Sequence, residues 1–173
     1  MSYASKIDAF ANVRLAGIGL GSAVAAGTGD TTQVVGNVVN RQIEQGFVDS
    51  ALVVLDWKTS LTADKTLGFK VTIEYSTNNS TWSTPEFLFG ATGSYETVET
   101  GADTNKYGQW TYRLQLSPEE QYFRISVTPD LSHTSTDTAV FSFGALTILI
   151  SFAIPKSINL FAFLVSILNS SPA

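Results

Sequence analysis

The chain has 173 residues with a net charge of −5, and 44% of its residues are hydrophobic against only 14% that are charged. This length fits one all-β domain with extra segments at its ends, and ten Lys and Arg residues in an acidic chain argue against direct binding of nucleic acid, which depends on neutralising phosphates. The absence of cysteine excludes disulfide bonds, thiolate zinc sites and a cysteine nucleophile.

The N-terminal segment, residues 1–30, is predicted to be an extended arm. It contains glycine at positions 17, 19, 21, 27 and 29, so it offers little side-chain area to bury and has a large conformational entropy to lose. We therefore expect residues 1–30 to become ordered against another subunit rather than to form a subdomain. The chain does not begin with a basic segment followed by an apolar one, which predicts synthesis in the cytoplasm without a cleaved export signal.

The first strand is expected over residues 32–39, where β-branched side chains surround Gly36. A glycine inside a strand indicates a bulge or a close approach of another backbone. A second strand is expected over residues 48–58. In its first half both the odd-numbered and the even-numbered residues are apolar, so we expect both faces of the strand to be covered there. Near Asp56 we expect the strand to be exposed to solvent.

The clearest strand in the sequence spans residues 66–76. Alternate positions are apolar, which predicts one dry face and one wet face, the dry one made by Leu67, Phe69, Val71, Ile73 and Tyr75. Asn78 and Asn79 then tolerate positive φ and bond to their own backbone, so Ser76–Ser80 is predicted to be a turn after which Trp82 starts the return.

Further strands are expected over residues 86–89, 109–116, 122–128 and 139–150, with Pro129 ending the third of these. Residues 90–108 are predicted to be a long loop or a mobile hairpin, and residues 130–137 a polar loop. Seven or eight strands without a helical period predict that residues 31–150 form an antiparallel β-sandwich of Ig-like or jelly-roll topology.

The C-terminal tail, residues 151–173, is apolar, and Lys156 carries the only charge between residues 141 and 168. Pro155 and Lys156 interrupt the apolar run, so it does not make a clean membrane-spanning helix. We favour a buried strand followed by an arm or helix docked on a neighbour over a membrane-associated segment or a poorly ordered end. A tail this apolar needs a partner, because exposed apolar surface of that size would aggregate.

Catalytic chemistry is not expected. His133 is the only histidine, and its Ser- and Thr-rich loop is typical of a solvated side chain rather than a catalytic relay. Acidic residues that could form a paired-carboxylate site are interpreted as turn residues: Glu86, Glu96, Glu99, Asp103, Glu119 and Glu120. A calcium site at Asp103 and Asn105 lacks the later glutamate of a known loop. We therefore predict no catalytic, cofactor-binding or metal-binding residues, and no enzyme.

Two other sequence patterns bear on ligand binding. The run from Gly17 to Gly21 has no buried strand before it and no Lys-Ser or Lys-Thr after it, which a phosphate loop requires. Tyr95, Tyr107 and Trp110 lie near the long loop and could stack on sugar rings, although the parity of Trp110 favours packing in the core.

The order of several short segments resembles a group of small structural proteins encoded near the capsid gene of tailed bacteriophages. The resemblance covers roughly residues 25–148 and is carried by turn and strand patterns at Gly27–Asp30, Asp49–Val54, Leu61–Leu67, Glu74–Ser76, Ser80–Trp82, Arg124–Ser132 and Thr136–Ala139. It implies a virion protein, namely a decoration or cement protein that sits on the outside of the capsid lattice. Its implied partners are the major capsid protein and copies of itself in a homo-oligomer.

This resemblance leads to an expectation about the ends of the chain. A cement protein acts by adding buried contact area between capsid subunits, so residues 1–30 and 151–173 are expected to carry intersubunit contacts. Two alternatives remain open: a carbohydrate-binding or host-adhesion module of a virion that uses Tyr95, Tyr107 and loop carboxylates, and a virion protein that associates with a membrane through its C-terminal tail.

Overall fold

The computed structural model describes residues 13–43, 46–47, 50–91, 94–101, 105–116, 120–132 and 136–148. Within these ranges every regular element is a β-strand, and all named strands pair antiparallel. The strands are β1 (Val13–Val24), β2 (Val34–Val35), β3 (Val39–Asn40), β4 (Gln42–Ile43), β5 (Gly46–Phe47), β6 (Ser50–Ser60), β7 (Thr66–Ser76), β8 (Glu86–Phe89), β9 (Glu96–Thr100), β10 (Asn105–Gln115), β11 (Tyr122–Leu131) and β12 (Thr138–Ile148).

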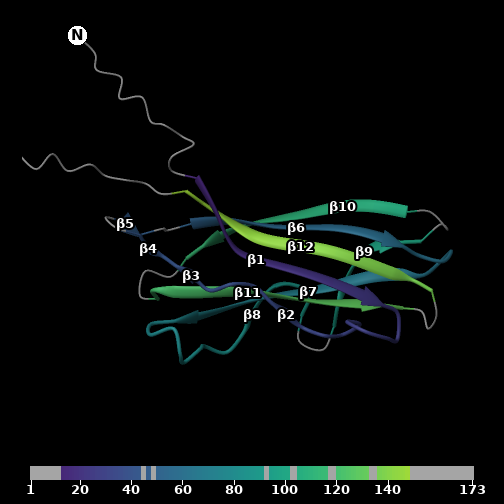
Figure 1. Ribbon diagram of the computed structural model, residues 1–173, viewed down its shortest axis with the longest axis horizontal. Helices are drawn as coiled ribbons and strands as arrows, with labels where there is room; N and C mark the ends of the chain where they lie inside the picture. Colours follow the sequence, from purple (N-terminus) through teal and green to yellow (C-terminus); the bar gives the residue numbers. More distant parts are fainter. Residues whose placement is uncertain are drawn as a thin grey trace, which may run out of the picture.

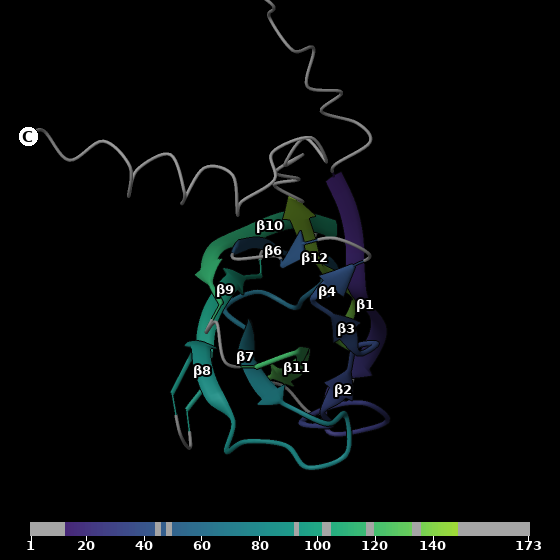
Figure 2. The ribbon, with the colours of Figure 1, turned by 90° about the vertical axis from the view of Figure 1, so that its left-hand side faces the viewer.

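These strands form a β-sandwich, which confirms the predicted fold class. Sheet A has the order β1-β12-β6-β10. Sheet B has the order β2-β11-β7-β8, with β3 also paired to β11 and β9 also paired to β7. Figure 1 shows the two sheets as layers, with β1 crossing in front of β12, and Figure 2 looks along the strands. A small hairpin, β4 with β5, lies outside both sheets.

The topology is that of a jelly roll rather than an immunoglobulin fold. The first half of the chain supplies β1, β2 with β3, β6 and β7, and the second half pairs with them in reverse order: β12, β11, β10, and β8 with β9. The chain is therefore one long antiparallel ribbon rolled into two sheets. When β2 with β3 and β8 with β9 are each taken as one interrupted strand, the two sheets have eight strands. This is the arrangement of two Greek keys that defines jelly rolls.

The prediction for β7 is confirmed on its inward side and wrong on its outward side. Leu67, Phe69, Val71 and Ile73 have no exposed area and pack against β11 residues such as Phe123 in the core. The side chains on the opposite face of β7 are not exposed to solvent, however, because Thr72 and Glu74 are only 8% and 9% exposed. Segments from outside sheet B cover this second side, and a single-strand pattern cannot reveal such cover.

The sandwich begins earlier than the predicted boundary at residue 31, because residues 13–24 form β1 along the whole of β12. Glycine is required there for close packing. A Cβ at Gly21 would lie 2.2 Å from the Cζ of Phe141, and a Cβ at Gly19 would lie 2.2 Å from the Cζ of Phe143. These glycines therefore make room for two core rings. Residues 1–12 and 151–173, the remainder of the predicted arm and the tail, lie outside the described residues.

The expected strand over residues 32–39 is divided into β2 and β3 at Gly36. The predicted close approach at this glycine is confirmed, since a Cβ there would lie 2.5 Å from the carbonyl oxygen of Gly17. The loop predicted over residues 90–108 contains β9 and the start of β10, and the return after the turn begins at Glu86 rather than at Trp82.

Pro129 does not end its strand, contrary to prediction, because β11 continues to Leu131. The ladder with β2 has already ended at Val127, and the carbonyl of Pro129 accepts a hydrogen bond from the amide of Thr31. The nitrogen and carbonyl of one strand residue point to the same side. The missing N–H therefore faces the side that β2 has left, and no hydrogen bond to β7 is lost.

Candidate functional site: the two outward faces of the sandwich

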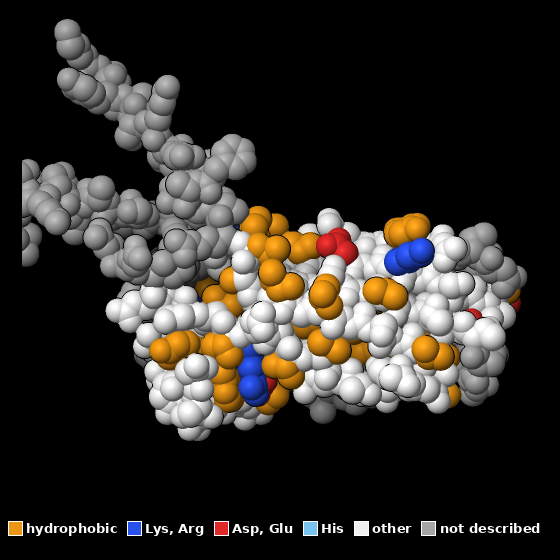
Figure 3. Space-filling view, viewed as in Figure 1, with side chains coloured by type: hydrophobic (Ala, Val, Ile, Leu, Met, Phe, Trp, Pro, Cys, Tyr) orange, Lys and Arg blue, Asp and Glu red, His pale blue; other side chains and the backbone are white. Residues whose placement is uncertain are grey.

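The outward face of sheet A is apolar and exposed. Antiparallel register places the outward-pointing residues of β1, β12 and β6 side by side, so that Leu15 lies next to Leu146 and Leu146 next to Leu52. Leu20 is 73% exposed, and Leu15 and Val140 are each 59% exposed. In Figure 3 hydrophobic side chains follow the course of β1 and β12 across the surface. We call this surface the apolar face; its hydrophobic members are Leu15, Ile18, Leu20, Val24, Leu52, Val54, Val140 and Leu146.

Few charges interrupt the apolar face, and they lie toward β10. Asp56 and Lys58 occupy outward positions on β6, and Asp56 accepts a hydrogen bond of 2.7 Å from the side chain of Gln109. An open hollow of about 470 Å³ lies between Leu20, Val140 and Tyr107, beside these charges. The ammonium of Lys58 lies 5.5 Å from the centre of the Tyr107 ring. The face therefore combines a dry strip along β1 and β12 with a polar margin.

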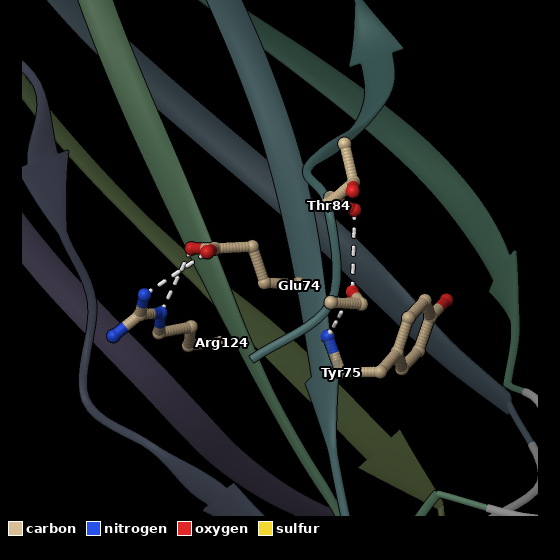
Figure 4. A network of polar contacts seen from close by, with 5 residues as sticks. Glu74, Tyr75, Thr84 and Arg124 are labelled. Carbon is tan, nitrogen blue, oxygen red and sulfur yellow. Dashed lines mark hydrogen bonds and ion pairs between the residues drawn. The ribbon is translucent and has the colours of Figure 1, made fainter. Parts of the chain in front are cut away.

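The outward face of sheet B is polar and covered. Arg124 of β11 donates two hydrogen bonds to Glu74 of β7, at 2.8 and 3.0 Å, and the two residues are register partners. The ring of Trp82 lies 4.3 Å from the guanidinium of Arg124 on the other side. Figure 4 shows this pair, with the backbone N–H of Tyr75 donating to the hydroxyl of Ser83 nearby. The segment after β7 thus folds back over its own sheet and fixes this charge pair.

A groove of about 290 Å³ crosses the same face. Its floor consists of Lys70 and Thr72 of β7 with Thr128 of β11, all at outward positions. Gln33 lies on one flank, and on the other lie Phe87 and Tyr95, with the Lys70 ammonium 4.3 Å from the centre of the Tyr95 ring. We call this surface the sheet B groove.

Two hydroxyl groups buried at the outward side of the β7–β11 pair have no hydrogen-bond partner among the described residues. They are Oγ1 of Thr72 and Oγ of Ser126, and the two residues are register partners on β7 and β11. Buried polar groups almost always have partners, since an unpaired one costs about 1–3 kcal/mol. Such a pair therefore requires a physical explanation.

One carboxyl group on sheet B has a shifted pKa. Asp130, at an outward position of β11, has its pKa raised above 3.8, chiefly by burial and then by the nearby charge of Asp30, while Lys70 acts in the opposite direction. On β7, burial followed by the charge of Glu86 raises the pKa of the Tyr75 phenol.

Among the acidic candidates that the structure describes, Glu96 lies on β9, and Glu86 and Glu120 both lie close enough to Tyr75 to raise the pKa of its phenol. Glu86 lies on β8, and Glu99 of β9 forms an ion pair of 2.8 Å with Lys106. His133, Asp103 and Glu119 lie outside the described residues. Among the residues that the structure describes, no group of three or more His, Cys, Asp or Glu side chains could hold a metal ion.

The aromatic candidates are separated by the sandwich. Tyr95 lies beside the sheet B groove, whereas Tyr107 is 71% exposed on the outward side of sheet A, so the two cannot stack on one ligand. Trp110 packs against Phe89 with ring centres 4.9 Å apart and stacks with Tyr112 at 5.7 Å. Its predicted inward direction is confirmed, although it is only partly buried at the margin of the core.

Sequence reasoning missed both surfaces. The apolar face lies on β1, β12 and β6, and the alternation of Ile18 and Leu20 with Gly17, Gly19 and Gly21 was the signal that could have revealed its first strand. No helix in the described part of the chain is long and apolar enough to cross a membrane, and the C-terminal tail lies outside that part.

Comparisons with known proteins add little. No protein-family model and no curated protein matches the sequence. Similar solved structures include infectious bursal disease virus, strain Gx (13% identity over 79% of this chain and 32% of that chain, TM-score 0.43). The CBM22 and GH10 modules of a Clostridium thermocellum xylanase match at 14% identity over 82% of this chain and 26% of that chain, with a TM-score of 0.35. A xylan-binding CBM22 domain from Paenibacillus barcinonensis matches at 9% identity over 81% of this chain and 88% of that chain, with a TM-score of 0.32. Likenesses this weak carry no argument about function.

Proposed function

We propose that this protein is a structural protein of a tailed-phage virion that binds the outside of the capsid lattice as a decoration or cement protein. The observation that carries the proposal is the apolar face, a group of exposed hydrophobic side chains on neighbouring strands, interrupted by Ser22 and Ser142, on an otherwise well-packed sandwich. Its occupant under this proposal is a capsid subunit, and neighbouring copies of the chain meet at the margins. The sequence resemblance to phage structural proteins supports the same assignment.

The energetics favour a role in a repeated assembly. Fully burying one Val or Leu side chain contributes about 1.5–3 kcal/mol, whereas association costs at least about 4 kcal/mol in lost freedom. Several of the exposed residues, such as Leu15, Leu20 and Val140, must therefore be buried together before a stable contact forms. A lattice repeats that contact many times, so modest contacts can sum to a large stabilisation.

The ends of the described body lie at one place on the same sheet. Val13 pairs with Ile148 at the end of sheet A, next to the Leu15 and Leu146 pair of the apolar face. Residues 1–12 and 149–173 therefore start beside the proposed contact surface, and they are proposed to add intersubunit contacts there. Deleting residues 1–30 is not a clean test of this idea, because it would remove β1.

The experiment is co-sedimentation of the purified full chain with capsids assembled from the major capsid protein of the same genome. We expect saturable binding and capsids that survive higher temperature when the chain is bound. Truncations that remove residues 1–12 or residues 149–173 leave every described strand in place and are expected to lower occupancy. A chain that never sediments with capsids, or that binds without protecting them from heat, would show that the proposed function is wrong.

A further inference from the structure

We propose that the free edge of β10 pairs antiparallel with β10 of a second copy of this chain, so that two copies of sheet A join across a two-fold axis near Gln109 and Trp110. The inference goes beyond the proposed function, which places copies side by side without saying how they meet. It rests on the edge of sheet A and is tested without capsids, so either proposal can fail while the other stands.

β10 offers a long, regular edge to a further strand. It is the last strand of sheet A, and among the described strands it pairs only with β6. Its register with β6 is unbroken from Asn105 to Gln115, and the strand contains no proline. Figure 1 shows β10 along the upper margin of the body. An edge of this kind leaves a row of backbone groups to pair with, whereas proteins usually block such edges with proline, bulges or short strands.

The other three edges of the described sandwich are blocked in these ways. β1 has a register shift between Ala16 and Gly19, and the carbonyl of Ile18 accepts a hydrogen bond from the amide of Asn37. On sheet B, β8 and β9 have four and five residues, and each has a register shift against β7. β2 and β3 have two residues each. Among the described edges, the edge of β10 is therefore the one that is open to strand addition.

The ladder pattern identifies the backbone groups of β10 that face the free edge. The amide of Ala25 donates to the carbonyl of Asp137, so the adjacent pair of Val24 and Thr138 is not hydrogen-bonded. Because hydrogen-bonded and non-hydrogen-bonded pairs alternate, the register through β12 and β6 directs Lys106 and the other even-numbered residues of β10 toward β6. The odd-numbered residues from 105 to 113 therefore direct their N–H and C=O groups to the free edge.

The side chains of β10 suit a second copy of the same strand. When odd-numbered residues face odd-numbered ones about an axis near Gln109 or Trp110, neither Lys106 nor Arg113 lies opposite a like charge. Trp110 is only partly buried and Tyr112 is 40% exposed, and their rings stack at 5.7 Å at the margin of the core. Pairing brings the same rings of the second copy alongside and buries aromatic area that the single chain exposes.

The first test is sedimentation velocity of the full chain at about 100 µM, where we expect dimers. Thr111→Pro removes an N–H that faces the free edge and keeps every hydrogen bond to β6, so it is expected to weaken the dimer at least about tenfold. If circular dichroism shows that this variant fails to fold, Thr111→Lys replaces it, because lysine blocks natural edge strands. The control is Val140→Asp on the apolar face, which is expected to leave the dimer unchanged.

The second test distinguishes edge pairing from any other dimer. The chain has no cysteine, so a single spin label can be attached through Gln109→Cys or, as the matched control, through Ser142→Cys. Both residues lie opposite Asp56 of β6 in one row across sheet A. With strands about 4.8 Å apart, edge pairing places the two copies of Gln109 within about 10 Å of each other and the two copies of Ser142 about 24 Å apart.

Electron–electron double resonance on each labelled chain measures these separations. We expect the shorter distance for the label at position 109. The proposal is overturned if the chain is monomeric at 100 µM, if the dimer survives the Thr111 variant, or if the label at position 142 gives an equal or shorter distance than the label at position 109.

Discussion

The two outward faces of the sandwich differ in a way that reverses the usual expectation for exposed and buried residues. On sheet A the outward positions are apolar and open, with Leu20 at 73% exposure. On sheet B the central outward positions of β7 are polar and covered, with Thr72 at 8% and Glu74 at 9% exposure. Apolar side chains exposed together indicate a partner, whereas polar side chains buried together must satisfy one another. The comparison teaches that sheet B is covered in part by its own chain, whereas sheet A exposes apolar side chains, which under the proposed function are covered by another molecule.

The difference follows from where the connecting segments pass. The segment before β2, the turn that carries Trp82, and the segment around Tyr95 all lie against the outward side of sheet B. The described connections place nothing comparable over β12 and β6 of sheet A. Burial on one face is thus an outcome of the loops rather than of the strands themselves.

The largest expected effect concerns β1, which carries half of the apolar face. Gly21→Ala puts a Cβ into the Phe141 ring, which is itself packed edge-on against Phe69 at 5.3 Å. We expect a loss of about 3 kcal/mol in the free energy of unfolding, measured by chemical denaturation. The control is Gly27→Ala, whose Cβ would meet the Val24 carbonyl at 3.3 Å and cost far less. Equal stability of the two variants would mean that β1 is not packed on the core.

A smaller effect compares one acidic residue on each face. Glu74→Ala leaves the half-buried Arg124 without its carboxylate, so we expect a loss of about 2 kcal/mol in unfolding free energy. Asp56→Ala removes an exposed carboxylate from sheet A that accepts one hydrogen bond from Gln109, and should cost less than about 0.5 kcal/mol. If the Asp56 variant were the less stable one, the covered and open faces would have been assigned the wrong way round.

The smallest effect is a pH dependence that arises on sheet B. Because the pKa of Asp130 is raised in the folded chain, the native state holds that proton more tightly than the unfolded state does. The contribution of this group to stability therefore falls as pH rises from 3.8 through the raised pKa. Asp130→Asn should be more stable than the wild type at neutral pH, and the advantage should disappear well below pH 3.8. Parallel stability curves for the two proteins across that range would contradict this assignment.

The sequence predicted the strands better than their surroundings. The period of β7 is visible because Leu67, Phe69, Val71 and Ile73 must all enter one core. The glycines of β1 misled the prediction, since their function is to accommodate Phe141 and Phe143 from a strand more than 100 residues later in the chain. Such a contact is set by the tertiary fold, and composition alone cannot distinguish it from flexibility.

The candidate surfaces could not be predicted for a related reason. Thr72, Ser126 and Tyr95 come from three separate segments, and only the pairing of β7 with β11 and the path before β9 bring them together. The apolar residues on both parities of residues 51–54 predicted cover on both sides, and this prediction is wrong on the outward side, where Leu52 is 39% exposed. The absence of a catalytic constellation is a prediction from the sequence, and it stays a prediction.

Under the proposed function, the outward side of sheet A is the surface that meets the capsid. Val140→Asp and Val35→Asp form a matched pair, since both residues are exposed valines, at 59% on sheet A and 47% on sheet B. We predict that Val140→Asp weakens capsid binding at least about tenfold and that Val35→Asp leaves it within about twofold of the wild type. Equal binding by the two variants, or loss of binding by Val35→Asp alone, would contradict the account.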